Sequence, residues 1–366
     1  MQAQQPVASL LPATPLLEQH KAASAEIGEY FGVRLPARFG EVETEYRAAR
    51  SACVLVDTNF KATFAFSGPD RNRYLNAILT SNVRDLQPGQ GAVGLLLTPQ
   101  GHILAEINTY ALADRILAVS HAIVRERSFS TLEKFIIMDD VTLEDITSST
   151  GTFTLVGPRA RDVISQLSGA DLSSLPAFSH IEATIGSISS RIVHHTWGNL
   201  PAATLIAGRE DLAALWAVLE RSSRERSGVP AGLEALNSVR LESGVAWFGS
   251  DFDDKVIPHE AGLERSHINY EKGCYTGQEI VERVRSRGHV NRRLSGLKFP
   301  TRVRPAAGTK LTAAGSEAGY VTSTAFSPQL GCPIGLGYLR REYASAGTAL
   351  DASGAPAEVV SLPLQA

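Results

Sequence analysis

The stretch of this chain best suited to chemistry is Lys-Gly-Cys-Tyr-Thr-Gly-Gln-Glu at residues 272–279. A cysteine attacks or binds metal as the thiolate, which nearby positive charge such as that of Lys272 favours. The flanking glycines let a ligand approach the backbone closely. Gln278 both donates and accepts hydrogen bonds, and Glu279 accepts them. We interpret the segment as a site with Cys274 as its working thiol; the alternative is a packing cysteine in a glycine-rich turn.

Two further groups of charged residues flank this stretch. Upstream, Glu242 and Glu260 stand beside small residues in an apolar context, where a carboxylate can accept paired N–H bonds from a heterocycle. Downstream, the basic run at residues 283–287 includes Arg283 and Arg285, whose guanidinium groups match carboxylates bidentately. This run indicates either an anion site or a solvated surface.

The overall composition narrows the classes of function. The chain has 366 residues, 43% hydrophobic and 20% charged, which is ordinary for a soluble globular protein of two or three domains. A net charge of −3 gives no broad attraction to nucleic acid, so a nucleic-acid partner is not expected. Three scattered cysteines, Cys53, Cys274 and Cys332, predict neither a disulfide scaffold nor a four-cysteine metal site, and they fit the cytoplasm.

Membrane and metal sites are not expected either. The N-terminus shows no basic region followed by an apolar core, as a secretory signal would. No apolar run approaches the roughly 18 residues needed to span a bilayer. The pair His194-His195 resembles a metal motif, but adjacent residues on a strand point to opposite faces. We therefore predict no metal site.

An internal repeat indicates how these residues are positioned. The segments at residues 64–79 and 153–167 both read as a strand, a Gly-Pro pair and a helix. Proline suits the first turn of a helix because its missing N–H is not needed there. Each unit is followed by alternating strand-like segments and a second strand–helix pair. The pattern predicts an α+β fold with two related halves, about residues 50–150 and 151–240.

The remaining segments complete the predicted organisation. Residues 1–15 read as a loose arm and 14–30 as a helix. The match to G-x-G-x-x-G at residues 89–94 precedes strands, so we interpret it as a hairpin and not as a nucleotide loop. Short apolar runs between turns after Arg293 predict a small antiparallel β-barrel over residues 291–366. The larger domain is expected to cover residues 16–290.

The chain resembles the folate-binding superfamily of the glycine-cleavage T-protein, an aminomethyltransferase, from about residue 16 to residue 363. The resemblance rests on the segments at residues 15–20, 67–70, 86–90, 240–244, 260–262, 319–323 and 334–338. Within this superfamily, the motif at residues 272–279 is similar to the signature of YgfZ-type proteins, which are folate-binding factors for the assembly or repair of iron–sulfur clusters. The T-protein itself usually carries an acidic residue at the position of Cys274 and a basic residue at that of Gln278.

A second departure concerns catalysis. The T-protein carries paired aspartates after its glycine-rich hairpin, and this chain has Ala105 and Glu106 there. Alanine cannot accept a proton, which leaves Glu106 as the only matched catalytic carboxylate. Its extra methylene moves the carboxylate by roughly 1 Å, and such a misplacement can cost about a hundredfold in rate.

The resemblance implies a central cavity that binds tetrahydrofolate or a one-carbon derivative, formed by the two halves and closed by the barrel. It implies that Glu242 and Glu260 are carboxylates on the pterin side of this cavity and that Arg283 or Arg285 binds the anionic folate tail. It also implies that the motif loop lies near the cavity mouth, with Lys272, Cys274, Gln278 and Glu279 lining or supporting it.

Three functions follow as hypotheses. The first is a folate-dependent factor for iron–sulfur proteins in which Cys274 contacts a carrier or client protein, because one cysteine cannot hold a [4Fe–4S] cluster alone. The second is a tetrahydrofolate-dependent aminomethyltransferase that uses Glu106. The third is a folate-linked tRNA-modification factor, whose RNA affinity would fall with salt.

Overall fold

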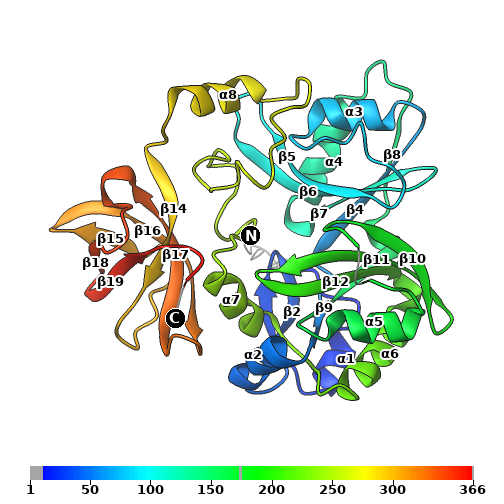
Figure 1. The fold of residues 1–366 in the computed structure, drawn as a ribbon, viewed down its shortest axis with the longest axis horizontal. Helices are drawn as coiled ribbons and strands as arrows, with labels where there is room; N and C mark the ends of the chain where they lie inside the picture. Colours follow the sequence, from blue (N-terminus) through cyan, green and yellow to red (C-terminus); the bar gives the residue numbers. More distant parts are fainter. Residues whose placement is uncertain (1–10, 173–174, 365–366) are drawn as a thin grey trace, which may run out of the picture.

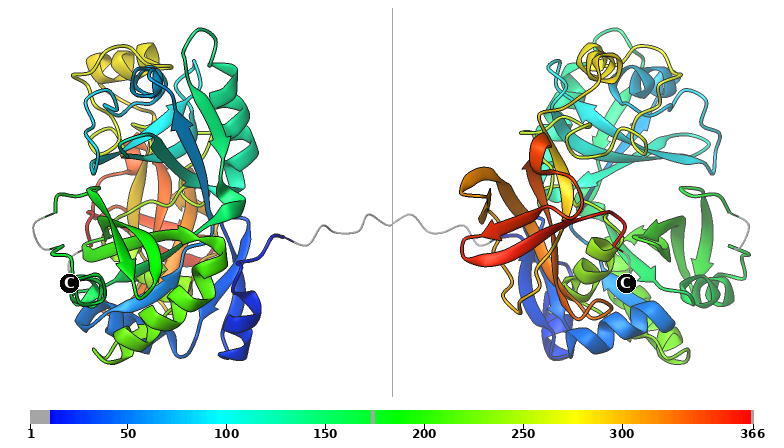
Figure 2. Two further views of the ribbon diagram at one scale, coloured as in Figure 1. Left: turned by 90° about the vertical axis from the view of Figure 1, so that its right-hand side faces the viewer. Right: turned by 60° about the vertical axis from the view of Figure 1, so that its left-hand side comes forward.

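The computed structural model describes residues 11–172 and 175–364. It contains a five-stranded antiparallel sheet and a six-stranded mixed sheet that lie face to face, and a closed six-stranded barrel beside them (Figures 1 and 2). This arrangement confirms the predicted α+β fold with two related halves and a C-terminal barrel. The expected loose arm lies mostly outside the described residues; within the described part, Ala13 forms a β-bridge with Arg34.

The two halves repeat one order of elements. The first runs β4 (Lys61–Ser67), α3 (Arg71–Ile78), β5 (Gly91–Leu97), β6 (Ile103–Ala111), β7 (Ile116–His121) and α4 (Arg125–Lys134). The second runs β9 (Thr150–Val156), α5 (Ala160–Ser168), β10 (His180–Ile185), β11 (Ile188–Trp197), β12 (Leu200–Gly208) and α6 (Leu212–Arg224). The strands are ordered β5-β6-β7-β4 in one sheet and β10-β11-β12-β9 in the other, which is the same topology.

The halves also exchange strands. β3 (Val54–Asp57) leads directly into β4 but pairs with β9, and β8 (Thr142–Asp145) leads into β9 but pairs with β4. β13 (Val229–Pro230) adds to the far side of β3. A division of the chain near residue 150 therefore leaves one strand of the first half, β3, in the sheet of the second half.

Residues 14–30 do not form the single helix expected for them. α1 covers Leu17–Ala22, and Glu26–Tyr30 is β1, which pairs with β2 (Val33–Arg38). The two turn residues, Phe31 and Gly32, have φ values of 53° and 76°, as a two-residue hairpin turn requires. The hairpin thus overrides the helical spacing of the apolar residues and carries Phe31 toward the sheets.

Three helices join the halves to the barrel. They are α2 (Val42–Ser51), α7 (Leu233–Glu242) and α8 (Gln278–Arg287), and Figure 1 shows α8 spanning from the first half toward the barrel. The barrel strands are β14 (Arg292–Lys298), β15 (Lys310–Ala313), β16 (Ser316–Ser327), β17 (Cys332–Arg340), β18 (Ala349–Ala352) and β19 (Ala355–Val360). Five of them fall on the predicted apolar runs, and β18 was not predicted.

The two sheets pack through a small apolar cluster on their facing sides, which includes Ala65, Tyr110, Val193 and Ile206. Their outer faces carry the larger cores under α3 and α4 and under α5 and α6. Successive side chains of a strand point to opposite faces. On β6, Ala105 and Ile107 therefore join the outer core, whereas Glu106 faces the space between the sheets.

Candidate functional site

A central cavity of about 480 Å³ lies between the two facing sheets. It is lined by strands of both halves and by two irregular segments, residues 244–248 and 261–267. Its aromatic wall consists of Phe31, Phe60, Tyr110, Phe178, Trp197, Trp247 and Phe248. A largely apolar cavity with a few polar groups is the usual form of a small-molecule site, and aromatic side chains offer flat faces on which a planar ring can stack.

Glu106 is the only carboxylate among the described residues that line this cavity. Its Oε1 accepts a hydrogen bond from His267 Nε2 at 3.0 Å, and its Oε2 accepts one from His121 Nε2 at 3.2 Å. Burial alone raises the pKa of Glu106, but the two histidines outweigh burial and hold it well below its ordinary value. The cavity therefore contains a fixed carboxylate that is ionised at neutral pH.

A lysine lies beside this carboxylate. Lys61 is at the start of β4, directly opposite His121 on β7, and its Nζ is 3.3 Å from His121 Nε2. Burial lowers the pKa of Lys61, and the charge of Glu106 counteracts this only in part. Within residues 11–172 and 175–364, no carboxylate oxygen comes within ion-pair distance of Lys61. Lys61 was not among the residues predicted from the sequence, although a lysine at the start of an alternating apolar strand was a usable signal.

His121 is a neutral imidazole between these two charges. Burial first, and then the charge of Lys61, lowers its pKa to about 4. It can therefore donate from Nε2 to Glu106 while Nδ1 carries no proton. His121 Nδ1 and Trp197 Nε1 are buried and have no hydrogen-bond partner among the described residues. Both residues line the cavity, so a ligand there could satisfy one acceptor and one donor.

The second sheet contributes a neutral polar group. His195 on β11 contacts Thr204 Oγ1 through Nε2 at 2.8 Å, and Thr204 contacts Thr154 at 2.8 Å. Burial lowers the pKa of His195 to about 4. The neighbouring His194 points away from the cavity and contacts the carbonyl oxygen of Pro176. The two histidines thus face opposite sides of the strand, as expected.

A buried ion pair fixes one wall of the cavity. Arg240 on α7 pairs with Asp251, and their side chains are 1% and 0% exposed. The Arg240 guanidinium lies 4.5 Å from the centre of the Trp247 ring, and Asp251 accepts a hydrogen bond from the Trp247 backbone N–H. Asp251 also accepts hydrogen bonds from Thr322 and Ser323 of the barrel. The pair therefore holds Trp247 against the cavity and ties α7 to the barrel.

The two carboxylates expected on the pterin side do not reach the cavity. Glu242 is buried, but it accepts hydrogen bonds from Tyr46 at 2.8 Å and Ser327 at 2.5 Å and pairs with Arg50. Glu260 pairs with Arg292 at 3.0 Å. Both carboxylates join the halves to the barrel instead, because partners distant in sequence occupy their oxygens.

The motif at residues 272–279 lies outside the cavity as well. Lys272 is buried and donates to the carbonyl oxygens of Asn76 and Leu79 at the end of α3, and burial lowers its pKa to about 8. Gly277 has φ of 82°, and a Cβ there would lie 2.6 Å from the Thr98 carbonyl oxygen. Two residues of the motif thus dock the loop onto the first half and leave Cys274 exposed.

The last four predicted residues lie on α8. Gln278 begins the helix, and Glu279 pairs with Arg283 at 2.7 Å on its exposed side. Arg285 lies 4.2 Å from the centre of the Tyr270 ring and lines a separate cleft. Of the nine predicted site residues, the structure places only Glu106 in the central cavity.

Among residues 11–172 and 175–364, no group of three or more histidine, cysteine or acidic side chains is arranged to hold a metal ion. None of the helices in this part of the chain has the length and apolar character needed to cross a membrane.

Comparison with known proteins gives consistent matches along the chain. Residues 16–270 match the model of the GCVT N-terminal domain, and residues 292–364 match that of the glycine cleavage T-protein C-terminal barrel domain. An aminomethyltransferase from Rubrobacter xylanophilus is 28% identical over 96% of this chain and 94% of its own length. One from a Nostoc species is 29% identical over 98% and 97%.

A solved structure matches equally far. The crystal structure of the glycine cleavage system aminomethyltransferase T from Bartonella henselae superposes with a TM-score of 0.87 at 26% identity. The match covers 97% of this chain and 98% of that protein.

Proposed function

Because the chain belongs to the glycine-cleavage T-protein family, we propose that it is a tetrahydrofolate-dependent aminomethyltransferase or a one-carbon transferase of that type. The aminomethyltransferase names of its relatives favour this function over the iron–sulfur role first expected from the motif at residues 272–279. The structural observation that carries the proposal is the ionised Glu106 in the wall of the central cavity.

The cavity fits a reduced pterin in size and chemistry. Its volume of about 480 Å³ lies in the range of small-molecule sites, roughly 300–1,000 Å³. Its aromatic wall suits a flat heterocycle, and among the described residues neither the donor Trp197 Nε1 nor the acceptor His121 Nδ1 has a hydrogen-bond partner. Glu106 is the one carboxylate of the described lining that could accept N–H bonds from such a ring.

Tetrahydrofolate would supply the nitrogen atoms that accept the one-carbon unit. The protein's part is to bind and orient the reactants and to stabilise charge. Glu106 remains anionic at neutral pH and can stabilise positive charge that develops at the reacting carbon, or accept a proton. Lys61 places a cationic or neutral amine beside His121, where it can donate to an oxygen or nitrogen of a ligand. The aromatic wall excludes water from these groups.

The test is formation of methylene-tetrahydrofolate and ammonia from an aminomethyl carrier by the purified protein. We expect turnover by the parent and its loss in Glu106→Gln, which keeps the size of the side chain and removes the charge. Glu317→Gln, on the exposed surface of the barrel, is the matched control. A parent protein that binds tetrahydrofolate tightly yet gives no product would rule out the transferase function.

A second candidate rests on Cys274. Its thiol is exposed on a loop that Lys272 and Gly277 dock onto the first half, so a partner protein can reach it. This arrangement favours a folate-dependent factor for iron–sulfur carriers or clients. The activity of a [4Fe–4S] enzyme should fall in cells that lack this gene and recover with the parent protein but not with Cys274→Ser. If the deletion leaves the activity of that enzyme unchanged, this candidate function is ruled out.

A further inference from the structure

Lys61 lies where two cavities of the protein meet. Its side chain lines the central cavity, and it also lines a further cavity, of about 780 Å³, beside the first turn of α4. Lys61 is the only described residue that lines both of these cavities. A small molecule in either cavity would therefore contact the same side chain.

The hydrogen bonds around His121 indicate the protonation state of Lys61. Glu106 is ionised and only accepts hydrogen bonds, so His121 Nε2, at 3.2 Å from Oε2, carries the proton that it donates. Lys61 Nζ lies 3.3 Å from the same Nε2. A protonated lysine has three donors and no acceptor, so it would place N–H groups against the N–H of His121. A neutral amine has a lone pair that can accept this proton, and the geometry therefore favours the neutral form.

The surroundings of the amine favour its neutral form as well. Burial lowers the pKa of Lys61, and the charge of Glu106 counteracts this only in part. The centre of the Phe60 ring lies 4.9 Å from Nζ, so an aromatic group stands beside the amine. A lysine that is desolvated among apolar groups loses its proton readily and becomes a nucleophile toward carbonyl carbon.

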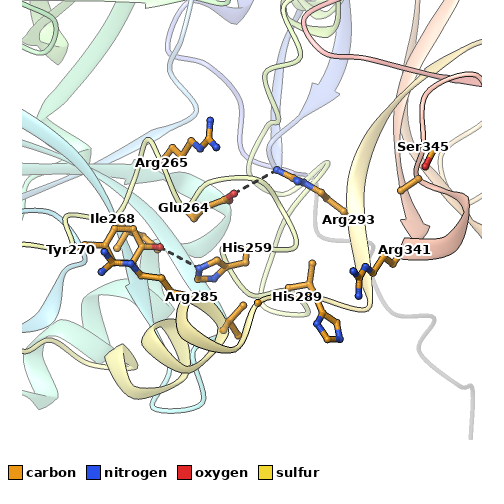
Figure 3. Close-up of a pocket in the computed structure, with 14 residues that line it drawn as sticks. His259, Glu264, Arg265, Ile268, Tyr270, Arg285, His289, Arg293, Arg341 and Ser345 are labelled. Atoms are coloured by element: carbon orange, nitrogen blue, oxygen red, sulfur yellow. Dashed lines mark hydrogen bonds and ion pairs between the residues drawn. The ribbon is translucent and has the colours of Figure 1, made fainter.

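Other cationic groups beside the cavities are not suited to this chemistry. Arg240 also lines the central cavity, but its guanidinium pairs with Asp251. The cleft that Arg285 lines contains arginines and histidines but no lysine among its described residues (Figure 3). Guanidinium groups stay protonated in proteins. Lys61 is therefore the one primary amine in the described lining of these three cavities.

We propose that Lys61 is a nucleophile that holds the one-carbon unit as a methylene iminium on its way to the acceptor. The inference rests on the proposed function for the identity of this acceptor, tetrahydrofolate. The unit is at the oxidation level of formaldehyde, and it comes either from formaldehyde itself or from an aminomethyl carrier. Every step keeps this oxidation level, so no oxidant or reductant is needed.

Both sources lead to the same adduct. With formaldehyde, the Lys61 nitrogen bonds to the carbon and one of its protons moves to the oxygen, which then takes a proton from solvent and leaves as water. With an aminomethyl carrier, the nitrogen displaces ammonia, which takes a proton from Lys61. The bond from the carbon to the carrier then breaks with its electron pair left on the carrier. In each case the lone pair of the Lys61 nitrogen closes the double bond of the iminium.

Release of the carbon regenerates the amine. The carbon bonds to a nitrogen of the acceptor, the proton of that nitrogen moves to Lys61, and the bond between Lys61 and the carbon breaks with its electron pair returned to the amine. The iminium is cationic, and the anionic Glu106 in the same cavity stabilises it. Lys61 and Glu106 thus have complementary parts in one transfer.

The first experiment traps the adduct and needs no folate. The parent protein is treated at pH 7 with limiting formaldehyde and cyanoborohydride, which reduces an iminium to a methylated amine, and its peptides are analysed by mass spectrometry. The internal control is Lys310, which is exposed on the barrel. Each unit by which a pKa is lowered gives about ten times more neutral amine. We therefore expect Lys61 to be methylated at least about tenfold faster than Lys310.

Repetition with an aminomethyl carrier identifies the source of the carbon. Methylation of Lys61 by the carrier, unchanged when an aldehyde scavenger is added, supports the proposal with the carrier as the source. Methylation by formaldehyde alone supports it with formaldehyde as the source. If Lys61 is methylated by neither, or no faster than Lys310, the proposal is overturned.

A second experiment separates this inference from the proposed function. Transfer to tetrahydrofolate is measured for Lys61→Gln, which keeps a hydrogen-bond donor, and for Lys61→Met, which has none, with Lys310→Gln as the matched control. We expect both Lys61 variants to be slowed by the same factor, because neither forms an iminium, and the control to match the parent. A Lys61→Gln variant that is as fast as the parent overturns the inference and leaves the proposed function standing. Trapping at Lys61 without any transfer to tetrahydrofolate by the parent overturns the proposed function and leaves Lys61 as an amine that reacts with aldehydes.

Discussion

His267 holds the carboxylate of Glu106 from 161 residues away in the sequence, with Nε2 donating to Oε1 at 3.0 Å. The backbone of His267 is itself fixed, because its carbonyl oxygen accepts a hydrogen bond from Thr80 Oγ1 at 2.6 Å. The segment that carries His267 also separates the central cavity from the cleft that Arg285 lines. The position of the candidate catalytic carboxylate therefore depends on the same short segment that borders both cavities.

The replacement His267→Phe should disturb Glu106 without removing it. The two hydrogen bonds offset burial, so loss of one of them should raise the pKa of Glu106 toward its ordinary value. We expect the acid limb of the transfer rate to move to higher pH, with a smaller rate at its optimum. The pH profile of turnover measures this. His102→Phe, on the turn between β5 and β6 and outside the lining of either cavity, is the control; an unchanged profile in His267→Phe would show that this hydrogen bond does not set the ionisation of Glu106.

Lys61→Met should separate stability from function. A largely buried amine without a carboxylate partner costs free energy, so its removal should leave the free energy of unfolding unchanged or increase it by about 1 kcal/mol. The transfer rate should nevertheless fall, because the amine beside His121 is lost. Urea unfolding and turnover are measured together, with the exposed Lys310→Met as control. A variant that is destabilised and fully active would contradict the assigned place of Lys61 in the site.

The sequence predicted the architecture better than the site, for reasons visible at particular residues. The repeat of strand, Gly-Pro and helix depends on local spacing, and it led to both halves. Glu106 was found through a family pattern on one strand. Glu242 was misplaced because its partners, Tyr46, Arg50 and Ser327, come from elements 196, 192 and 85 residues away. Whether a carboxylate binds a ligand or a neighbouring side chain is decided by such distant contacts, which one sequence does not display.

The replacement Asp251→Asn should strongly lower the free energy of unfolding, because Asp251 is buried and paired with Arg240. It leaves the Arg240 guanidinium buried without a counter-charge, and breaking one side of a buried ion pair costs about 3–5 kcal/mol of unfolding free energy. Trp247, which stacks on Arg240, should become more mobile, and its fluorescence should change. Asp254→Asn breaks an exposed pair with Arg127 and should cost less than about 1 kcal/mol. Equal losses in the two variants, measured by urea unfolding, would argue against the structural role of the pair.

Stability should fall as the pH is lowered from about 6.5 toward 4. The pKa values of His121 and His195 are about 4 in the folded protein because both are buried, whereas an unfolded histidine titrates near 6.5. Between these values the unfolded chain binds more protons, so each histidine lowers the unfolding free energy by at most about 1.4 kcal/mol per pH unit. The lowered pKa of Glu106 affects stability only below the ordinary pKa of a glutamate, about 4.3. Urea midpoints measured at pH 7, 6 and 5 should therefore decline less in His195→Gln than in the parent. The control is His289→Gln, which changes an exposed histidine, and its midpoints should decline as steeply as those of the parent. Parallel declines in the parent and His195→Gln would mean that His195 is not buried in its neutral form.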